Sequence, residues 1–107
     1  MNQHDLDIIA RLTSADFPDD PELEWKIIFH ESIPPVTAKL GRVLDFKPTE
    51  GYDRNGFSLI FITELVSQYY PQGTFKLVHP NLGIIELFMV PVGPDKEGFI
   101  QYEIIFT

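Results

Sequence analysis

The stretch that decides the fold is residues 72–107, QGTFKLVHPNLGIIELFMVPVGPDKEGFIQYEIIFT. Three apolar runs of strand length lie within it, at residues 74–78, 84–92 and 99–106. Two short segments, residues 79–83 and 93–98, separate these runs, and both hold the glycine, proline, asparagine or aspartate that tight turns require. The sequence therefore predicts a meander of three antiparallel strands.

Three further strand patterns lie upstream of this meander. In residues 23–29 apolar side chains recur at every second position, which is typical of a half-buried strand. Residues 36–46 keep one apolar parity until Gly41-Arg42 interrupts it, and we expect a bulge there. Residues 57–63 are apolar on both faces, which indicates a central or covered strand. Six strands with short connections predict a mainly β fold, a small antiparallel barrel or sandwich.

The N-terminal segment is predicted to be helical and acidic. Residues 4–12 place apolar side chains at helical spacing, and Thr13 or Ser14 is a candidate N-cap for a second short turn. A further helical turn is expected at residues 64–70, before Pro71. We interpret residues 1–107 as one domain, in which residues 1–22 pack on the β core or lead into it.

The charge of the chain limits its partners. The 107 residues carry a formal net charge of −8, and residues 1–24 hold seven acidic side chains against one basic. A basic footprint for nucleic acid or for an anionic membrane surface is therefore not expected. Residues 1–5 contain neither a basic n-region nor an apolar stretch, so we expect a soluble, cytoplasmic protein that could still be incorporated into a particle.

No catalytic or metal-binding pattern is found in the sequence. Cysteine is absent, and the three histidines, at positions 4, 30 and 79, lack the spacing of metal ligands. The acidic residues 16–22 lack the spacing of an EF-hand, and no nucleophile or phosphate-binding motif occurs. We expect neither enzyme activity nor a metal or cofactor, and we expect His79, at a turn, to hold backbone groups.

Four side chains remain as candidates for contact with a ligand or partner: Tyr52, Tyr69, Tyr70 and Glu86. The tyrosines fall in predicted loops, where they could stack on a sugar, anchor a protein, or plug the ends of a barrel. Glu86 lies on an apolar strand face, which indicates a rim position, an ion pair with Lys76 or Arg42, or a functional role. With Glu103 it could also form the carboxylate pair of a hydrolase, if the two converge.

Several short motifs occur in an order that resembles a known family. They are Leu12-Thr13-x-x-x-Phe17, Phe57-Ser58-Leu59-Ile60-Phe61, Gln72-Gly73-Thr74-Phe75-Lys76-Leu77, His79-Pro80-x-Leu82-Gly83, Leu87-Phe88-Met89-Val90-Pro91-Val92-Gly93-Pro94 and Tyr102-Glu103-x-x-Phe106. Together they resemble an uncharacterised bacterial family of small β domains of unknown function, some of whose members sit beside phage-tail-like or tail-collar proteins. The resemblance implies a structural or assembly role. The chain departs from the family pattern in its acidic turn at residues 18–21 and its loop at residues 47–56.

We therefore expect a non-enzymatic structural or protein-interaction domain that acts through a protein partner or through self-association. A place in a phage-tail-like assembly is the more specific form that the resemblance implies. The alternative is a barrel that binds a small molecule or a sugar, which would require an enclosed pocket of several hundred Å³.

Overall fold

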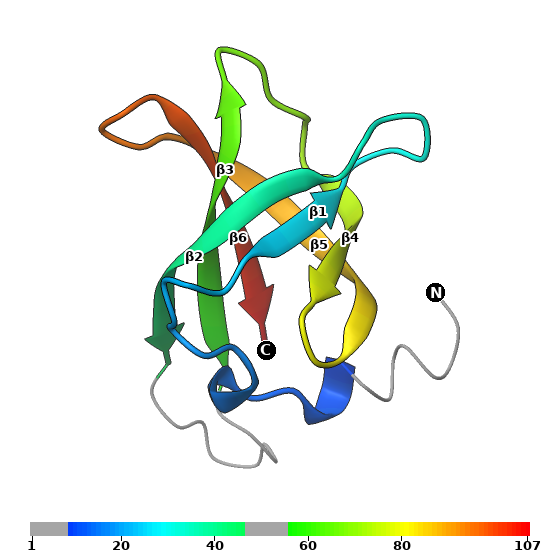
Figure 1. The fold of residues 1–107 in the computed structure, drawn as a ribbon. Coiled ribbons are helices and arrows are strands. Elements are labelled where there is room, and N and C mark those ends of the chain that lie inside the picture. The colour runs from blue at the N-terminus through cyan, green and yellow to red at the C-terminus, as the bar shows by residue number, and fades with distance from the viewer. Residues whose placement is uncertain (1–8, 47–55) are drawn as a thin grey trace.

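The computed structural model describes residues 9–46 and 56–107, in which six strands form a closed antiparallel barrel (Figure 1). The strands are β1 (Trp25–Ile28), β2 (Val36–Asp45), β3 (Phe57–Val66), β4 (Gly73–His79), β5 (Gly83–Pro94) and β6 (Phe99–Phe106). They follow one another around the barrel in the order β1-β2-β3-β6-β5-β4. The predicted mainly β fold is confirmed, and closure of the sheet selects the barrel over the sandwich.

The barrel closes through its shortest strand, β1. This strand pairs with β2 on one side and with β4 on the other, both antiparallel. Trp25 and Ile27 point inward and are fully buried, whereas Lys26 and Ile28 lie half-buried on the outside. The alternation read from the sequence therefore corresponds to the inside and the outside of the barrel.

The long strand β5 belongs to two ladders. Its first part pairs with β4, from His79–Gly83 to Gly73–Met89, and its last part pairs with β6, from Val90–Glu103 to Pro94–Ile100. The predicted meander and both of its turns are confirmed. Because β5 changes partner part-way along its length, it bends around the barrel.

Register shifts interrupt three of the ladders among the described strands, at Leu40/Arg42, Ile62/Val66 and Pro91/Gly93. The predicted bulge is confirmed at Leu40/Arg42, where β2 pairs with β3. A second shift lies at Pro91/Gly93, where β5 pairs with β6, and Gly93 has a φ of 97°. This positive φ lies where side chains with a Cβ are disfavoured, so the bulge requires glycine.

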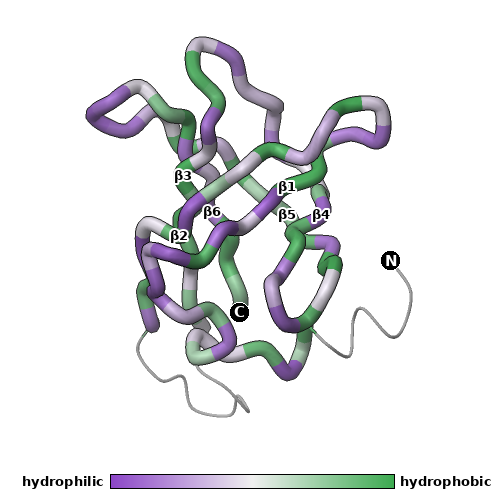
Figure 2. The backbone as a smooth tube through the Cα atoms, in the orientation of Figure 1, coloured by the Kyte–Doolittle hydropathy of each residue, from purple (hydrophilic) through white to green (hydrophobic). Residues whose placement is uncertain are grey.

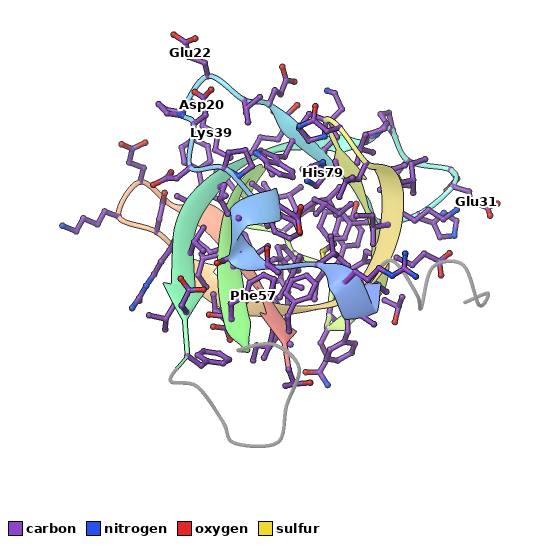
Figure 3. All side chains as sticks on the ribbon, turned by 90° about the horizontal axis from the view of Figure 1, so that it is seen from below. Asp20, Glu22, Glu31, Lys39, Phe57 and His79 are labelled. Atoms are coloured by element: carbon purple, nitrogen blue, oxygen red, sulfur yellow. The ribbon has the colours of Figure 1, made fainter. Side chains whose placement is uncertain are left out.

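Apolar side chains from all six strands fill the interior of the barrel. Figure 2 shows hydrophilic and hydrophobic residues alternating along much of the barrel, with hydrophilic stretches also in its loops. Viewed from below in Figure 3, side chains occupy the space inside the ring of strands, and the N-terminal segment crosses the opening. Two residues of that segment, Leu12 and Phe17, belong to the buried core.

The N-terminal segment agrees in part with the prediction. Residues 9–11 are helical, and a 3-10 turn, η1 (Ser14–Asp16), follows. Thr13 is its N-cap, and the Thr13 N–H donates to the Asp16 carboxylate at 2.8 Å. The predicted turn near Thr13 is thus confirmed, whereas the predicted helical residues 4–8 lie outside the described part of the chain.

The helical turn expected at residues 64–70 is wrong. Strand β3 continues to Val66, which pairs with Phe99, and Ser67 then leaves the strand with a φ of 64°. The buried Thr63 hydroxyl donates to the Ile100 carbonyl at 2.7 Å and accepts the Leu65 N–H at 3.1 Å. These bonds hold the backbone against β6 rather than in a helical turn.

We predict that Gly93→Ala lowers the free energy of unfolding by about 1–2 kcal/mol, because a residue with a Cβ is strained at this positive φ. An added Cβ would meet nothing within 4 Å, so the loss would come from the backbone alone. Urea denaturation monitored by tryptophan fluorescence measures it. Gly93→Asn is the control: because asparagine tolerates positive φ, its loss should be smaller, and equal losses would contradict the explanation.

Candidate functional site

The loop between β3 and β4 carries two of the candidate tyrosines. Tyr69 is 61% exposed, whereas Tyr70 is half-buried and stacks on Phe29, with ring centroids 4.5 Å apart and planes inclined by 15°. The third candidate, Tyr52, lies outside the described residues. Tyr70 therefore serves packing, and Tyr69 is the tyrosine of this loop that a partner could contact.

The Tyr102 hydroxyl holds this loop on the barrel. It accepts the Tyr70 N–H at 2.7 Å and donates to the Tyr70 carbonyl at 2.8 Å. Tyr102 and Phe75 also contact Phe29, at centroid distances of 5.0 and 4.8 Å. Burial raises the pKa of Tyr102 above the usual tyrosine value, while the hydrogen bond with the Tyr70 backbone opposes this shift. The aromatic cluster therefore plugs the upper end of the barrel, which is one of the roles expected for the loop aromatics.

The lower end is closed by Phe17 and His79. The Phe17 ring lies 5.9 Å from Trp25, 5.6 Å from Phe106 and 5.4 Å from His79, centroid to centroid. His79 is buried beneath the N-terminal segment that crosses the opening (Figure 3). Side chains from distant parts of the sequence thus meet at this end.

His79 ties the N-terminal segment to the turn between β4 and β5. Its Nδ1 accepts the N–H groups of Asn81 and Leu82, at 3.0 and 3.2 Å, so the ring proton lies on Nε2. Nε2 donates to the Asp16 carbonyl at 2.6 Å. The expected role of His79 in holding backbone groups is confirmed, and all its hydrogen-bonding capacity is used in that role.

Glu86 lies in a groove on the outer surface, where β5 and β6 diverge. Of the described residues, the two strands pair with each other only from Val90–Glu103 onward. Before that point β5 stays with β4, while the end of β6 stays with β3. The space between them is a groove of about 350 Å³, lined by both strands and by Ile9.

Exposed apolar side chains form the middle of this groove. Phe88 and Ile105 are 54% and 55% exposed, and both line it. Phe88 lies two residues before Val90 on β5, and Ile105 lies two residues after Glu103 on β6, where the two strands are no longer paired with each other. Ile84, 56% exposed, lies on the same outer face of β5. Large apolar side chains that gather on a surface are typical of contact with another protein.

Carboxylates lie at the two ends of the groove. Glu103 is opposite Val90, and Glu86 precedes Val90 by four residues on β5. At about 3.3 Å per residue, their places along the groove are about 13 Å apart, with Phe88 between them. Glycosidase carboxyls lie about 5–9.5 Å apart, so this spacing does not favour the hydrolase pair considered from the sequence.

Glu86 has a lysine beside it on the neighbouring strand. Lys76 of β4 is its cross-strand partner, whereas Arg42 of β2 pairs with Ile60 of β3. Within the described ranges, the ion pair closer than 4 Å is that of Lys26 and Glu24, at 3.1 Å. The ion pair expected for Glu86 is therefore not formed at that distance, and its carboxylate, half-buried at the groove, remains open to another cation.

Comparison with known proteins places the chain in a family. A family model for a domain of unknown function, DUF6916, matches residues 12–106. The chain belongs to this family. No curated protein and no solved structure matches it.

The described part of the DUF6916 domain contains neither a cluster of metal ligands nor a membrane-spanning helix. Within residues 9–46 and 56–107, no three side chains of the kinds that ligate metals lie close enough together to hold an ion. The helical residues in the same ranges form no segment that is long and apolar enough to cross a membrane. The outer groove combines exposed apolar surface with two carboxylates.

The sequence indicated Glu86 but not the groove around it. Phe88 and Ile105 lie within predicted strands and do not stand out there, because both faces of β5 and β6 are rich in apolar side chains. The available signal was the parity of β5: Ile84, Glu86 and Phe88 share the face that holds the acid. A buried strand face rarely carries an unpaired carboxylate. The face of β5 that carries Glu86 is therefore expected on the outside of the DUF6916 barrel.

We predict that His79→Phe lowers the free energy of unfolding of the DUF6916 domain by about 2–3 kcal/mol. An aromatic ring is kept at the site, but the Asp16 carbonyl and the two turn N–H groups lose their partner. Urea denaturation measures the loss. The control is His30→Phe, which removes a similar local bond to Ser32 at an exposed site and should cost less than about 1 kcal/mol. Equal losses would contradict the bridging role.

We also predict that stability falls at high pH, in part through Tyr102. Because the folded state raises the pKa of this phenol, it holds the proton more tightly than the unfolded chain. Its contribution is full below about pH 10, the usual tyrosine value, and is lost as pH rises through the folded pKa. Urea denaturation from about pH 8 to pH 11 should show a shallower fall for Tyr102→Phe than for the wild type. Equal slopes would contradict the assignment.

Proposed function

We propose that this DUF6916 domain is a non-enzymatic protein-interaction domain, acting through a protein partner or through self-association. The observation that carries the proposal is the outer groove, in which Phe88 and Ile105 expose more than half of their surface between two carboxylates. Burying such apolar side chains contributes about 25 cal/mol per Å². Covering Phe88 and Ile105 with a partner would therefore contribute favourably to the free energy of binding.

The packing of the barrel supports this function over the alternative of an internal ligand site. Trp25, Ile27, Leu59, Phe61 and Leu77 are fully buried in the interior. Aromatic clusters around Phe29 and Phe17 fill the two ends. A small molecule or sugar inside the barrel would have to displace these side chains, whereas a protein that contacts the outer groove would not.

A place in a phage-tail-like assembly is the more specific form of the proposal. Its basis is the ordered set of motifs described for the sequence. The outer groove is also compatible with a structural subunit that contacts a neighbouring subunit. The general proposal does not depend on it, because an apolar surface can serve a partner of any assembly.

The proposal is tested by removing the apolar side chains of the groove. The double variant Phe88→Thr/Ile105→Thr places a β-branched residue, which favours strands, at both positions while it removes most of the exposed apolar surface. Tagged wild type and variant would be expressed in the source cells, and captured proteins would be quantified by mass spectrometry. Light scattering of the purified proteins over a range of concentrations would measure self-association.

We expect at least one partner, or a concentration-dependent dimer, that the double variant loses by about tenfold or more. The matched control is Leu44→Thr/Val66→Thr, which changes two exposed apolar side chains outside the groove and should keep the interaction. The proposal fails if the wild type is a monomer at all concentrations and captures the same proteins as the double variant.

A further inference from the structure

We propose that the outer face of β4 and β5 binds a second copy of this chain about a two-fold axis, so that Lys76 of each copy meets Glu86 of the other. This inference rests on the proposed function and names the partner as the chain itself. It follows from the charges, the exposed apolar side chains and the strand register of this face, which together make the face complementary to itself.

The first observation is a pair of opposite charges side by side on two strands. Lys76 of β4 and Glu86 of β5 are direct cross-strand neighbours, so their side chains stand on the same face of the sheet. This is the outer face, because the adjacent Leu77 and Leu87 are buried in the core. Within the described residues the two charges form no ion pair shorter than 4 Å. Each of them can therefore meet an opposite charge on another molecule.

The second observation is that apolar side chains flank the charged pair at both ends. Two residues along the strands in one direction, Val78 is opposite Ile84, and two residues in the other direction, Thr74 is opposite Phe88. Ile84 and Phe88 are 56% and 54% exposed, and Val78 is half-buried. A partner that covers this face would bury apolar surface on both sides of the charges.

The third observation is the symmetry that the register creates. A two-fold axis that runs between β4 and β5, along the strands, lays each cross-strand pair over the same pair of the other copy in reverse order. Lys76 then lies over Glu86 of the other copy, and Ile84 lies over Val78. Phe88 lies over Thr74 in the same way. Sheets packed face to face lie about 10 Å apart, a distance that a lysine and a glutamate extended toward each other can bridge.

The charge of the face favours a second copy despite the charge of the chain. The net charge of −8 makes two copies repel each other overall. The contact itself is neutral, because two lysines and two glutamates alternate in it, and exposed charges more than about 10 Å away are largely screened at 0.1 M salt. Another protein would have to present the reverse of this pattern, whereas a second copy presents it by symmetry.

The small size of the contact sets the expected affinity. It is centred on two strands, which is less than the roughly 20–30 residues a side of a stable interface. We therefore expect a reversible dimer with a dissociation constant of about 10 μM to 1 mM. Sedimentation equilibrium of the purified full chain, loaded from about 10 μM to about 1 mM, measures it.

Reversing either charge should break the dimer. We expect Lys76→Glu and Glu86→Lys each to weaken self-association at least tenfold, because like charges would then face each other. Glu86→Lys also changes the net charge from −8 to −6, which by itself would favour association. Its loss of the dimer would therefore report the contact rather than the overall charge.

Combining the two reversals should restore the dimer. An equimolar mixture of the Lys76→Glu and Glu86→Lys chains should form a heterodimer, because every charge again faces its opposite. The double variant Lys76→Glu/Glu86→Lys should form a homodimer for the same reason, and both should come within about threefold of the wild-type affinity. The matched controls are Lys96→Glu and Glu97→Lys, which make the same charge changes at an exposed turn and should stay within about twofold.

The position of the contact has a separate readout. In a mixture of isotope-labelled and unlabelled wild type, we expect intermolecular NOEs between the methyl groups of Ile84 and Val78. The inference is overturned if the wild type stays monomeric to about 1 mM, if the single reversals keep the dimer, if neither combination restores it, or if the NOEs lie elsewhere.

These outcomes can be told apart from failure of the proposed function. A captured protein that is lost with Phe88→Thr/Ile105→Thr would still support an interaction domain, even if the charge reversals had no effect on self-association. In that case the partner would be a different protein, and the two-fold contact alone would be rejected. A wild type that neither dimerises nor captures a protein sensitive to that double variant would reject both proposals.

Discussion

The structure depends on closing six strands around an interior that side chains must fill completely. Closure passes through β1, which has only four residues and must pair on both edges. Its Trp25 lies at the meeting point of several rings, with Phe61 at 5.3 Å and His79 at 5.0 Å between centroids. Because so short a strand forms few backbone hydrogen bonds with its neighbours, the packing of its inward side chains has to stabilise the closed barrel.

The ends of the barrel follow from the same constraint. Strands leave both openings unfilled, so segments outside the sheet supply Phe17 below and Tyr70 above. Polar groups fix each segment: His79 binds the Asp16 carbonyl, and the Tyr102 hydroxyl binds both backbone groups of Tyr70. Among the described residues, Trp25 Nε1 is the buried side-chain polar atom without such a partner, and the large apolar area of the indole offsets the cost.

Local patterns predicted the strands, but not how they close. Alternation in residues 23–29, the bulge near Gly41 and the two turns of the meander are short-range features, and each was readable because its cause lies within a few residues. The strand extension to Val66 was missed because the Thr63 hydroxyl bonds to Ile100, a residue distant in sequence. Glu86 was recognised as unusual, yet its groove required the register of β5 against β6, which single-strand patterns do not contain.

The groove is itself a product of barrel geometry. A strand that leaves one neighbour to join another cannot pair along its whole length on both sides, so β5 exposes an edge where it is still held by β4. An apolar strand edge of this kind invites pairing with copies of the same chain, and charged side chains oppose it. Glu86 and Glu103 line that place, and their charge opposes the close approach of another carboxylate. Carboxylates at the ends of the groove thus oppose indiscriminate edge-to-edge pairing, while Phe88 and Ile105 between them keep an exposed apolar surface that a specific protein contact could cover.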